Sequence, residues 1–348
     1  MSRQKNKVPK AYTKARSRQK KSPSVGDLTE GVLKGDITLL SRAITLVEST
    51  HPDDQKKSYE IIENCLLNGA QSIRVGITGV PGVGKSTFIE SLGTAMTALG
   101  KKVAVLAVDP TSSLSRGSIL GDKTRMPLLA NDPLAFIRPS PSGDSLGGVA
   151  RKTRESIVLC EAAGFDVVFI ETVGVGQSET AVHSMVDFFL LLKLAGAGDE
   201  LQGIKRGIME MADAVVINKA DGANLKRAMR AKSDFERALH LYPPKENRWS
   251  PKVLTCSAIE NKGIAEIWKL IEDYVQLTIN NSSFEKKRKS QNKYWFLQAV
   301  ERLLTQGFYR NPEVKKELSE MTRKVETNEI SPFRAAEELL SAYNRQLK

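Results

Sequence analysis

The stretch Gly79-Val-Pro-Gly-Val-Gly-Lys-Ser86 places two glycines, a lysine and a serine at the spacing of a phosphate-binding loop. It follows an apolar, β-branched run at Ile73–Thr78 and opens an amphipathic stretch at Lys85–Leu99. Glycines let the backbone curl so that successive N–H groups point at phosphate oxygens, and the helix start adds its positive dipole end. A glycine-rich turn that binds no ligand would have no need to lie between a strand and a helix. The stretch therefore predicts a nucleotide site in an α/β domain.

Within such a loop each side chain has an expected task. Lys85 is expected to reach the β- and γ-phosphates, and the Ser86 hydroxyl is expected to bind Mg²⁺. The residues predicted to hold the phosphates are Gly79, Val80, Pro81, Gly82, Val83, Gly84, Lys85, Ser86 and Thr87.

The pattern of apolar and polar residues around the loop predicts the architecture. Short apolar runs alternate with amphipathic, helix-spaced stretches, which is typical of a parallel sheet covered by helices on both faces. We expect a doubly wound, mostly parallel α/β fold of the P-loop type, whose ligands bind at the carboxyl ends of the strands. The expected strands are Ile73–Thr78, Val103–Val108, Val167–Glu171, Phe188–Leu192, Ala214–Asn218 and Val253–Cys256. The expected helices in this part are Lys85–Leu99, Gly148–Ala163, Leu225–Leu241 and Ile264–Leu277.

The flanking regions lack strand patterns. Helical spacing at Leu28–Val47 and Gln55–Leu67 predicts N-terminal helices, and three further helical patterns after residue 280 predict a helical C-terminal extension. Its length and its aromatic residues favour a dimerisation element over a simple cap on the core. The expected division is a basic arm (1–26), an N-terminal helical segment (27–70), a P-loop domain (71–280) and this extension (281–348).

The net charge of +12 is concentrated in the basic arm, which carries nine Lys or Arg and no acid. The remainder is nearly neutral, at +3, which makes a nucleic-acid-binding switch protein an alternative rather than the leading hypothesis. A solvated arm is expected at residues 1–26, with targeting or anion binding as alternatives. No apolar run approaches the length of a membrane span, and three widely spaced cysteines favour a reducing, cytoplasmic location.

A second motif predicts which base is bound. Asn218-Lys-Ala-Asp221 ends an apolar run and matches the guanine-recognition element of GTPases. The Asp221 carboxylate can accept hydrogen bonds from the ring N–H and the exocyclic amine of guanine, and adenine offers no such pair. Lys219 can lie along the base, and Asn218 can tie this loop to the phosphate loop. Cys256-Ser257-Ala258 resembles the element whose backbone N–H meets the guanine oxygen.

Carboxylates for magnesium and groups for hydrolysis are expected at the strand ends. Glu171 begins Glu-Thr-Val-Gly174, where other GTPases carry an aspartate, and Asp109 ends the preceding strand. Carboxylates near one triphosphate repel each other unless a cation neutralises them, so Mg²⁺ is expected. The metal-associated residues are predicted to be Ser86, Asp109, Asp122 and Glu171. The catalytic candidates are Lys85, Asp109, Glu171, Gln177 and Lys205, and Arg116, Arg125, Arg138 and Arg154 can each supply transition-state charge.

Long segments of the chain resemble the MeaB/ArgK-type GTPases, chaperones of adenosylcobalamin-dependent methylmalonyl-CoA mutase. Besides the two nucleotide motifs, the resemblance rests on residues 108–113, 117–126, 171–179 and 196–205, and it covers about residues 28–280. It implies a homodimeric GTPase in which Asp109, Asp122 and Glu171 serve Mg²⁺ and residues 196–205 form a third switch that senses the mutase. It also implies that GTP hydrolysis is coupled to cofactor loading and removal of damaged cofactor.

Two further alternatives share this fold. A kinase of an amino-acid transport system would use ATP, which the Asn218–Asp221 motif argues against. Nickel-insertion GTPases usually carry His or Cys clusters, and this chain has only three of each.

Overall fold

The computed structural model describes residues 23–67, 71–108, 125–139, 146–172, 178–196 and 206–346. The chain forms two compact units, Met1–Ser283 and Phe284–Lys348. None of the helices in the described ranges combines the length and the hydropathy that a membrane span requires.

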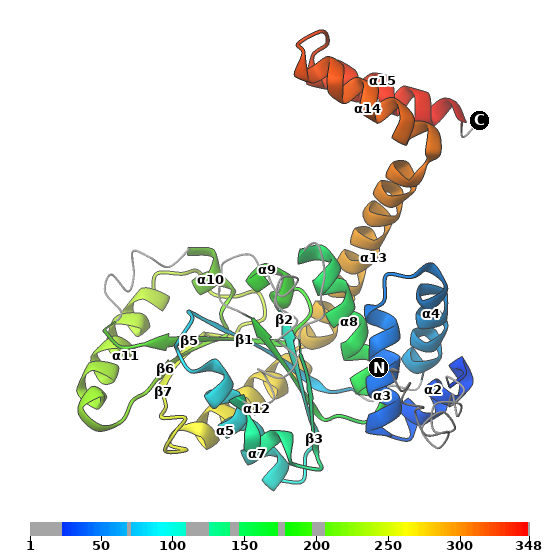
Figure 1. Cartoon of the computed structure of the whole chain (residues 1–348). Coiled ribbons are helices and arrows are strands. Elements are labelled where there is room, and N and C mark those ends of the chain that lie inside the picture. Colours follow the sequence, from blue (N-terminus) through cyan, green and yellow to red (C-terminus); the bar gives the residue numbers. More distant parts are fainter. Residues whose placement is uncertain are drawn as a thin grey trace, which may run out of the picture. The chain divides into compact units, whose positions relative to one another are not determined.

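The first unit is built on a seven-stranded sheet in the order β3-β2-β4-β1-β5-β6-β7, and every neighbouring pair is parallel (Figure 1). The expected doubly wound fold is confirmed. The expectation of six strands was incomplete, because β3 is a four-residue edge strand and too short to show a pattern. The strands are β1 (Ile73–Gly79), β2 (Val103–Val108), β3 (Ala135–Arg138), β4 (Val167–Thr172), β5 (Phe188–Leu194), β6 (Ala214–Asn218) and β7 (Lys252–Thr255).

Helices cover both faces of the sheet, which is why its strands are apolar almost throughout. One face packs against α5 (Lys85–Ala98), α7 (Pro127–Ala130) and α12 (Ile264–Asn280) in the largest buried cluster. The other face packs against α8 (Leu146–Ala162), α9 (Ser178–His183), α10 (Arg206–Met211) and α11 (Leu225–Leu239). Figure 1 shows these two layers on opposite sides of the sheet.

The strands β1 and β4 are neighbours followed by helices on opposite faces. Side chains alternate along β1, so that Ile77 joins the α5 cluster, and a Cβ at Gly76 would lie 3.0 Å from Val182 on α9. In open α/β sheets, ligands bind outside the carboxyl ends of the strands, at the position where two neighbouring strands are followed by helices on opposite faces. The phosphate-loop residues and Glu171 lie there.

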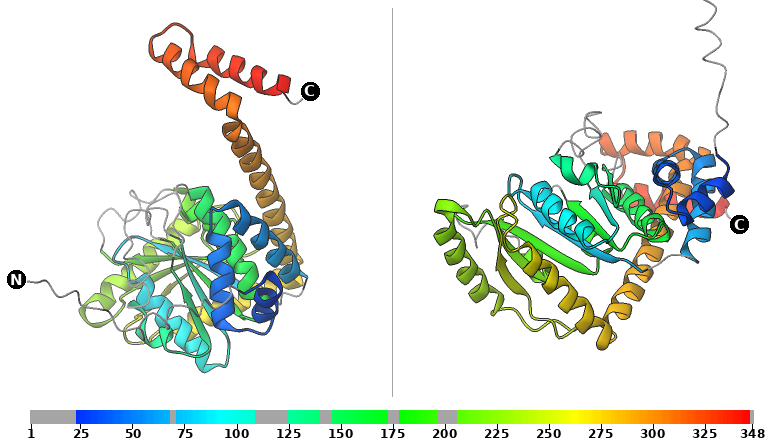
Figure 2. Two further views of the ribbon diagram at one scale, coloured as in Figure 1. Left: turned by 45° about the vertical axis from the view of Figure 1, so that its right-hand side comes forward. Right: turned by 90° about the horizontal axis from the view of Figure 1, so that it is seen from below.

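Three N-terminal helices, α2 (Val25–Leu33), α3 (Ile37–Glu48) and α4 (Pro52–Leu66), pack on each other and on α8 (Figure 2). The pattern at Leu28–Val47 was expected to be one helix, but it is two. Gly35 has a φ of +74°, and the Asp36 side chain accepts hydrogen bonds from Thr38 N and Leu39 N to start α3.

The second unit contains α13 (Ser283–Arg310) from its second residue onward. It continues with α14 (Pro312–Glu326) and α15 (Pro332–Gln346). The chain turns at Asn311, whose side chain caps α14, and Pro312 occupies the first helical turn, where its missing N–H costs nothing. α14 and α15 pack side by side (Figures 1 and 2). The expected helical C-terminal extension is confirmed, and its first helix, α13, spans 28 residues.

Candidate nucleotide site

The loop between β1 and α5 has a shape that depends on its glycines. Gly82 and Gly84 have φ angles of +80° and +92°, in the left-handed region that other residues rarely adopt. A Cβ at Gly79 would lie 2.6 Å from the carbonyl oxygen of Leu192, and one at Gly84 would lie 2.9 Å from Nδ2 of Asn218. The close approach of the loop to β5 and to Asn218 therefore excludes side chains at both positions.

Lys85 folds back over this loop. Its Nζ donates a hydrogen bond to the Gly79 carbonyl at 2.7 Å and a longer one to the Val80 carbonyl at 3.3 Å. Burial lowers the pKa of Lys85, which the carboxylates of Glu171 and Glu179 oppose. The ammonium group is thus held over the loop among main-chain carbonyls, in reach of an anion bound by the loop.

Ser86 and Glu171 bring two hard oxygen atoms together at the same end of the sheet. Ser86 Oγ donates to Glu171 Oε1 at 3.3 Å, although the two residues come from different elements. β4 is fixed against β1 at this level by a 2.8 Å hydrogen bond between the hydroxyls of Thr172 and Thr78, both buried. Hydroxyl and carboxylate oxygens are ligands that Mg²⁺ prefers, so this pair fits the ion. Among the described residues there is no group of three acidic, His or Cys side chains suited to a metal.

Asn218 joins the second nucleotide motif to the phosphate loop. Its Nδ2 donates to the Val83 carbonyl at 2.9 Å, and its Oδ1 accepts from the Ala258 backbone N–H at 3.3 Å. The buried Cys256 thiol, 3.4 Å away, also donates to Oδ1. Burial raises the pKa of Cys256 to about 12, so the thiol keeps its proton for this bond. One amide therefore connects three loops.

Asp221 and Lys219 complete this loop cluster. Ser257 Oγ donates to Asp221 Oδ2 at 2.6 Å and also accepts from the Glu260 backbone N–H at 3.2 Å, which fixes the carboxylate from the side. Lys219, with a φ of +57°, extends over the loop so that its Nζ donates to the Gly82 carbonyl at 3.0 Å. Within the described part of the chain the other carboxylate oxygen, Oδ1, has no hydrogen-bond partner, so it can accept from a ligand.

The geometry of these loops coincides with a family relationship across most of the chain. The model of the family described as "Methylmalonyl Co-A mutase-associated GTPase MeaB" matches residues 40–313. The chain belongs to the MeaB family of GTPases. A probable GTPase of Mycobacterium tuberculosis is 50% identical over 92% of this chain and 96% of its own length. The GTPase ArgK of Escherichia coli is 46% identical over 86% of this chain and 90% of its own length.

Two further relatives carry names that bear on function. The mouse protein named "Methylmalonic aciduria type A homolog, mitochondrial" is 44% identical over 92% of this chain and 79% of its own length. A crystal structure described as "LAO/AO transport system kinase" is 38% identical with a TM-score of 0.72, covering 92% of this chain and 97% of that one.

In this MeaB-family GTPase, several of the candidate residues lie outside the described residues. They are Asp109, Asp122, Gln177, Lys205 and Arg116, together with residues 197–205 of the segment expected to act as the third switch. The remaining nucleotide-site candidates, which come from the ends of β1, β4, β6 and β7, converge on one region around the phosphate loop.

Sequence reasoning did not single out Glu179, although it ends residues 171–179, one of the segments that carry the family resemblance. Glu179 is only 3% exposed, and its charge raises the pKa of Lys85, which places a second carboxylate close to the phosphate loop. Arg138 is oriented away from such a role, since Glu48 on α3 binds it through both carboxylate oxygens, the first at 3.0 Å from Nε. It joins β3 to the N-terminal helices.

Proposed function

We propose that this GTPase serves as a chaperone of adenosylcobalamin-dependent methylmalonyl-CoA mutase, or of a related acyl-CoA mutase. In this proposal, GTP hydrolysis is coupled to loading of intact cofactor and to protection and reactivation of the mutase. The family description names the mutase, and the mouse relative carries the name of the corresponding aciduria. A cytoplasmic location is part of the proposal.

The hydrogen bond from Asn218 to Val83 is the observation that carries the nucleotide assignment. It joins the loop that would read the base to the loop that would hold the phosphates, at 2.9 Å. Asp221 would then accept from guanine, Lys219 would lie along the base, and the Ala258 region would face the guanine oxygen. Lys85 would leave the Gly79 carbonyl for the β- and γ-phosphates.

Mg²⁺ is proposed as the cofactor of this site. Ser86 would be its direct protein ligand, and Glu171 would act directly or through water, with Asp109 and Asp122 as the further carboxylates. The ion would neutralise charge on the phosphate oxygens. Gln177 would orient the attacking water, and Lys205 would belong to the segment that senses the client. Chelation with EDTA is expected to stop hydrolysis, and excess Mg²⁺ is expected to restore it.

The client is tested by GTP turnover with and without a purified adenosylcobalamin-dependent acyl-CoA mutase from the same source. Stimulation that is lost in Lys205→Ala, and kept in Lys226→Ala on the exposed side of α11, would support the proposal. An unstimulated enzyme that forms no complex with the mutase would contradict the client assignment. The same assay with ATP tests the kinase alternative, for which ATP turnover above GTP turnover is required.

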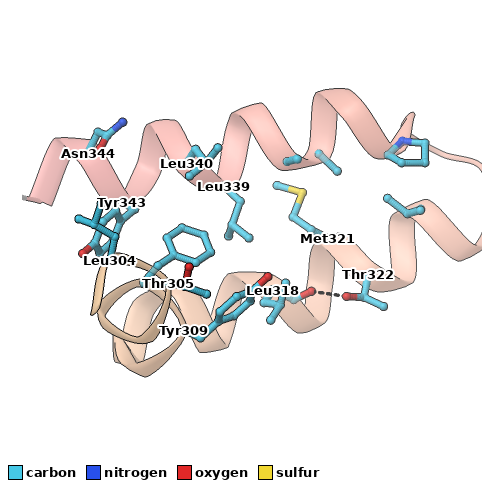
Figure 3. A pocket seen from close by; sticks show the side chains of 15 residues that line it. Leu304, Thr305, Tyr309, Leu318, Met321, Thr322, Leu339, Leu340, Tyr343 and Asn344 are labelled. Atoms are coloured by element: carbon cyan, nitrogen blue, oxygen red, sulfur yellow. Dashed lines mark hydrogen bonds between the residues drawn. The ribbon is translucent and has the colours of Figure 1, made fainter. Parts of the chain in front are cut away.

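We also propose that residues 281–348 form a dimerisation element. The last turns of α13, together with α14 and α15, line an open apolar groove of about 670 Å³ (Figure 3). In the described residues after Arg310, the buried apolar side chains are Val314, Ala335 and Leu339. So few buried side chains make a weak core, and an apolar partner surface would complete it.

A second copy of this chain fits the groove best, because the same unit also carries exposed apolar side chains outside the groove. Phe296 and Leu303 on α13 are 65% and 55% exposed, and Phe333 at the start of α15 is 84% exposed. A two-fold dimer buries matching patches on both copies. Light scattering should show a dimer for the wild type and a monomer for Leu340→Glu at the groove. Phe333→Glu tests the exposed apolar side chains outside the groove, and a dimer that survives both variants would contradict this assignment.

A further inference from the structure

The segment after Thr124 lies along the helix that begins with the phosphate loop. Leu129, fully buried, packs on Gly93 of α5, where a Cβ would lie 2.8 Å from its Cδ2 atom. One residue earlier, the Leu128 N–H donates to Glu90 Oε1 at 2.7 Å. Met126 is 1% exposed and belongs to the same buried cluster as α5. Earlier residues of this segment therefore lie closer to the N-terminus of α5.

This path ends with Arg125 at the level of the phosphate loop. An α-helix rises about 1.5 Å per residue, so Lys85 lies about 12 Å from Gly93 along α5. Glu90, which accepts the Leu128 N–H, lies about 7.5 Å from Lys85 along α5. Arg125 precedes Leu128 by three residues and is separated from α7 by the non-helical Met126, so its long side chain can reach the level of Lys85. The electrostatics agree with this placement. Burial lowers the pKa of Lys85, Glu171 and Glu179 oppose that effect, and the charge of Arg125 adds to the lowering.

Arg125 is also available for a ligand. Its side chain is exposed, and it forms no hydrogen bond or ion pair with the residues that the structure describes. Other arginines of the same unit are engaged: Arg74 with Glu161, Arg138 with Glu48 and Arg151 with Glu155. Two cations that approach each other, as Lys85 and Arg125 do, repel until an anion lies between them.

We propose that Arg125 is a catalytic residue of GTP hydrolysis, whose guanidinium contacts a γ-phosphate oxygen and stabilises the charge of the transition state. In the reaction, the oxygen of water forms a bond to the γ-phosphorus, and the bond from that phosphorus to the β–γ bridging oxygen breaks. The electron pair goes to GDP, and the water proton leaves with inorganic phosphate or solvent. This inference rests on the GTP site proposed above. It assigns the charge-stabilising role to one arginine of the same chain.

The test compares Arg125→Ala and Arg125→Lys with the wild type in single-turnover and steady-state GTP hydrolysis. Arginines in this role contribute about 10³- to 10⁵-fold to turnover, and we expect Arg125→Ala to lower kcat at least about 100-fold. The Kd of a fluorescent GDP analogue should change less than about threefold, because GDP lacks the γ-phosphate. Guanidinium chloride at low millimolar concentration should restore part of kcat in Arg125→Ala. Arg237→Ala, at a side chain 80% exposed on α11, is the matched control.

Three results separate this inference from the proposed site. A wild type that does not hydrolyse GTP overturns the proposed site itself. An active wild type with kcat of Arg125→Ala within about threefold overturns only the role of Arg125. A parallel loss of kcat and GDP affinity without rescue by guanidinium also overturns it, since Arg125 would then be shaping the neighbouring loop. Lys at this position should restore little, because it lacks the forked donors of arginine.

Discussion

Asn218 donates its side-chain amide to the main-chain carbonyl of Val83 at 2.9 Å, across 135 residues of sequence. The oxygen of the same side chain, Oδ1, accepts hydrogen bonds from the Ala258 N–H and from the Cys256 thiol. A single buried amide therefore holds the phosphate loop and two base-side loops in one arrangement. Removal of this amide should disturb all three loops together.

Asn218→Ala is expected to weaken GTP and GDP binding together, by about 10- to 100-fold, since both nucleotides use the same loops. The buried groups left without partners should lower the free energy of unfolding by about 1–3 kcal/mol. Nucleotide titration and thermal unfolding measure the two effects. The control is Asn280→Ala, at an exposed asparagine at the end of α12. Unchanged affinity for both nucleotides would show that the bridge has no part in binding.

Asp221→Asn should shift base preference from GTP toward xanthosine triphosphate. The amide presents a donor where the carboxylate accepted, and xanthine carries a second carbonyl in place of the exocyclic amine. Each lost charge-assisted hydrogen bond contributes roughly 1.5–3 kcal/mol, so GTP affinity should fall at least about 100-fold. Competition titrations with both triphosphates test this. Ser257→Ala, which removes the 2.6 Å support of the carboxylate, should cause a smaller loss without a change of preference.

Lys85→Met should abolish hydrolysis and slightly stabilise the protein without nucleotide. Burial lowers the pKa of Lys85, so keeping its ammonium charged destabilises the folded state. That penalty is fully present below the lowered pKa and disappears as pH rises through the ordinary value of 10.5. Thermal unfolding should therefore show a Tm about 2 °C above wild type at neutral pH, with the difference shrinking toward pH 10.

Nucleotide reverses that order of stability. At about 100 times its Kd, a nucleotide adds roughly 2.7 kcal/mol to the wild type, and Lys85→Met should gain much less. Full turnover in this variant would exclude a role of Lys85 in catalysis.

Arg138→Ala should affect stability and leave chemistry intact. Glu48 holds Arg138 through both carboxylate oxygens, and both side chains are only about a fifth exposed, at 20% and 17%. Leaving one partner unpaired in this setting costs about 1–3 kcal/mol, less than in a fully buried pair. Urea unfolding gives the stability change, and kcat at a temperature where the variant is folded should stay within about twofold. A large loss of kcat would reassign Arg138 to the reaction.

Much of the fold was predictable because each long element carries its own periodicity. The strand Val103–Val108 and the helix from Lys85 were recognisable from their own apolar spacing. This spacing shows which face of a single element is buried, whatever the other elements do. The strand Ala135–Arg138 was not, since a four-residue edge strand forms only because β2 is present to pair with it. The break at Gly35 was also missed, because apolar spacing continues across it.

The amino-acid sequence alone shows that this chain carries a phosphate loop and a guanine-type motif, because each motif is a short stretch of glycine, lysine or carboxylate residues at fixed spacing. How these motifs meet in space depends on the folded arrangement of the strands. Parallel pairing brings the carboxyl ends of β1 and β4 together, so Ser86 reaches Glu171 and Asn218 reaches Val83. It also separates Arg138, which is bound to α3, from Arg125, whose segment lies on α5. These contacts join residues far apart in the sequence and depend on how the elements pack, so residue spacing within a motif does not reveal them.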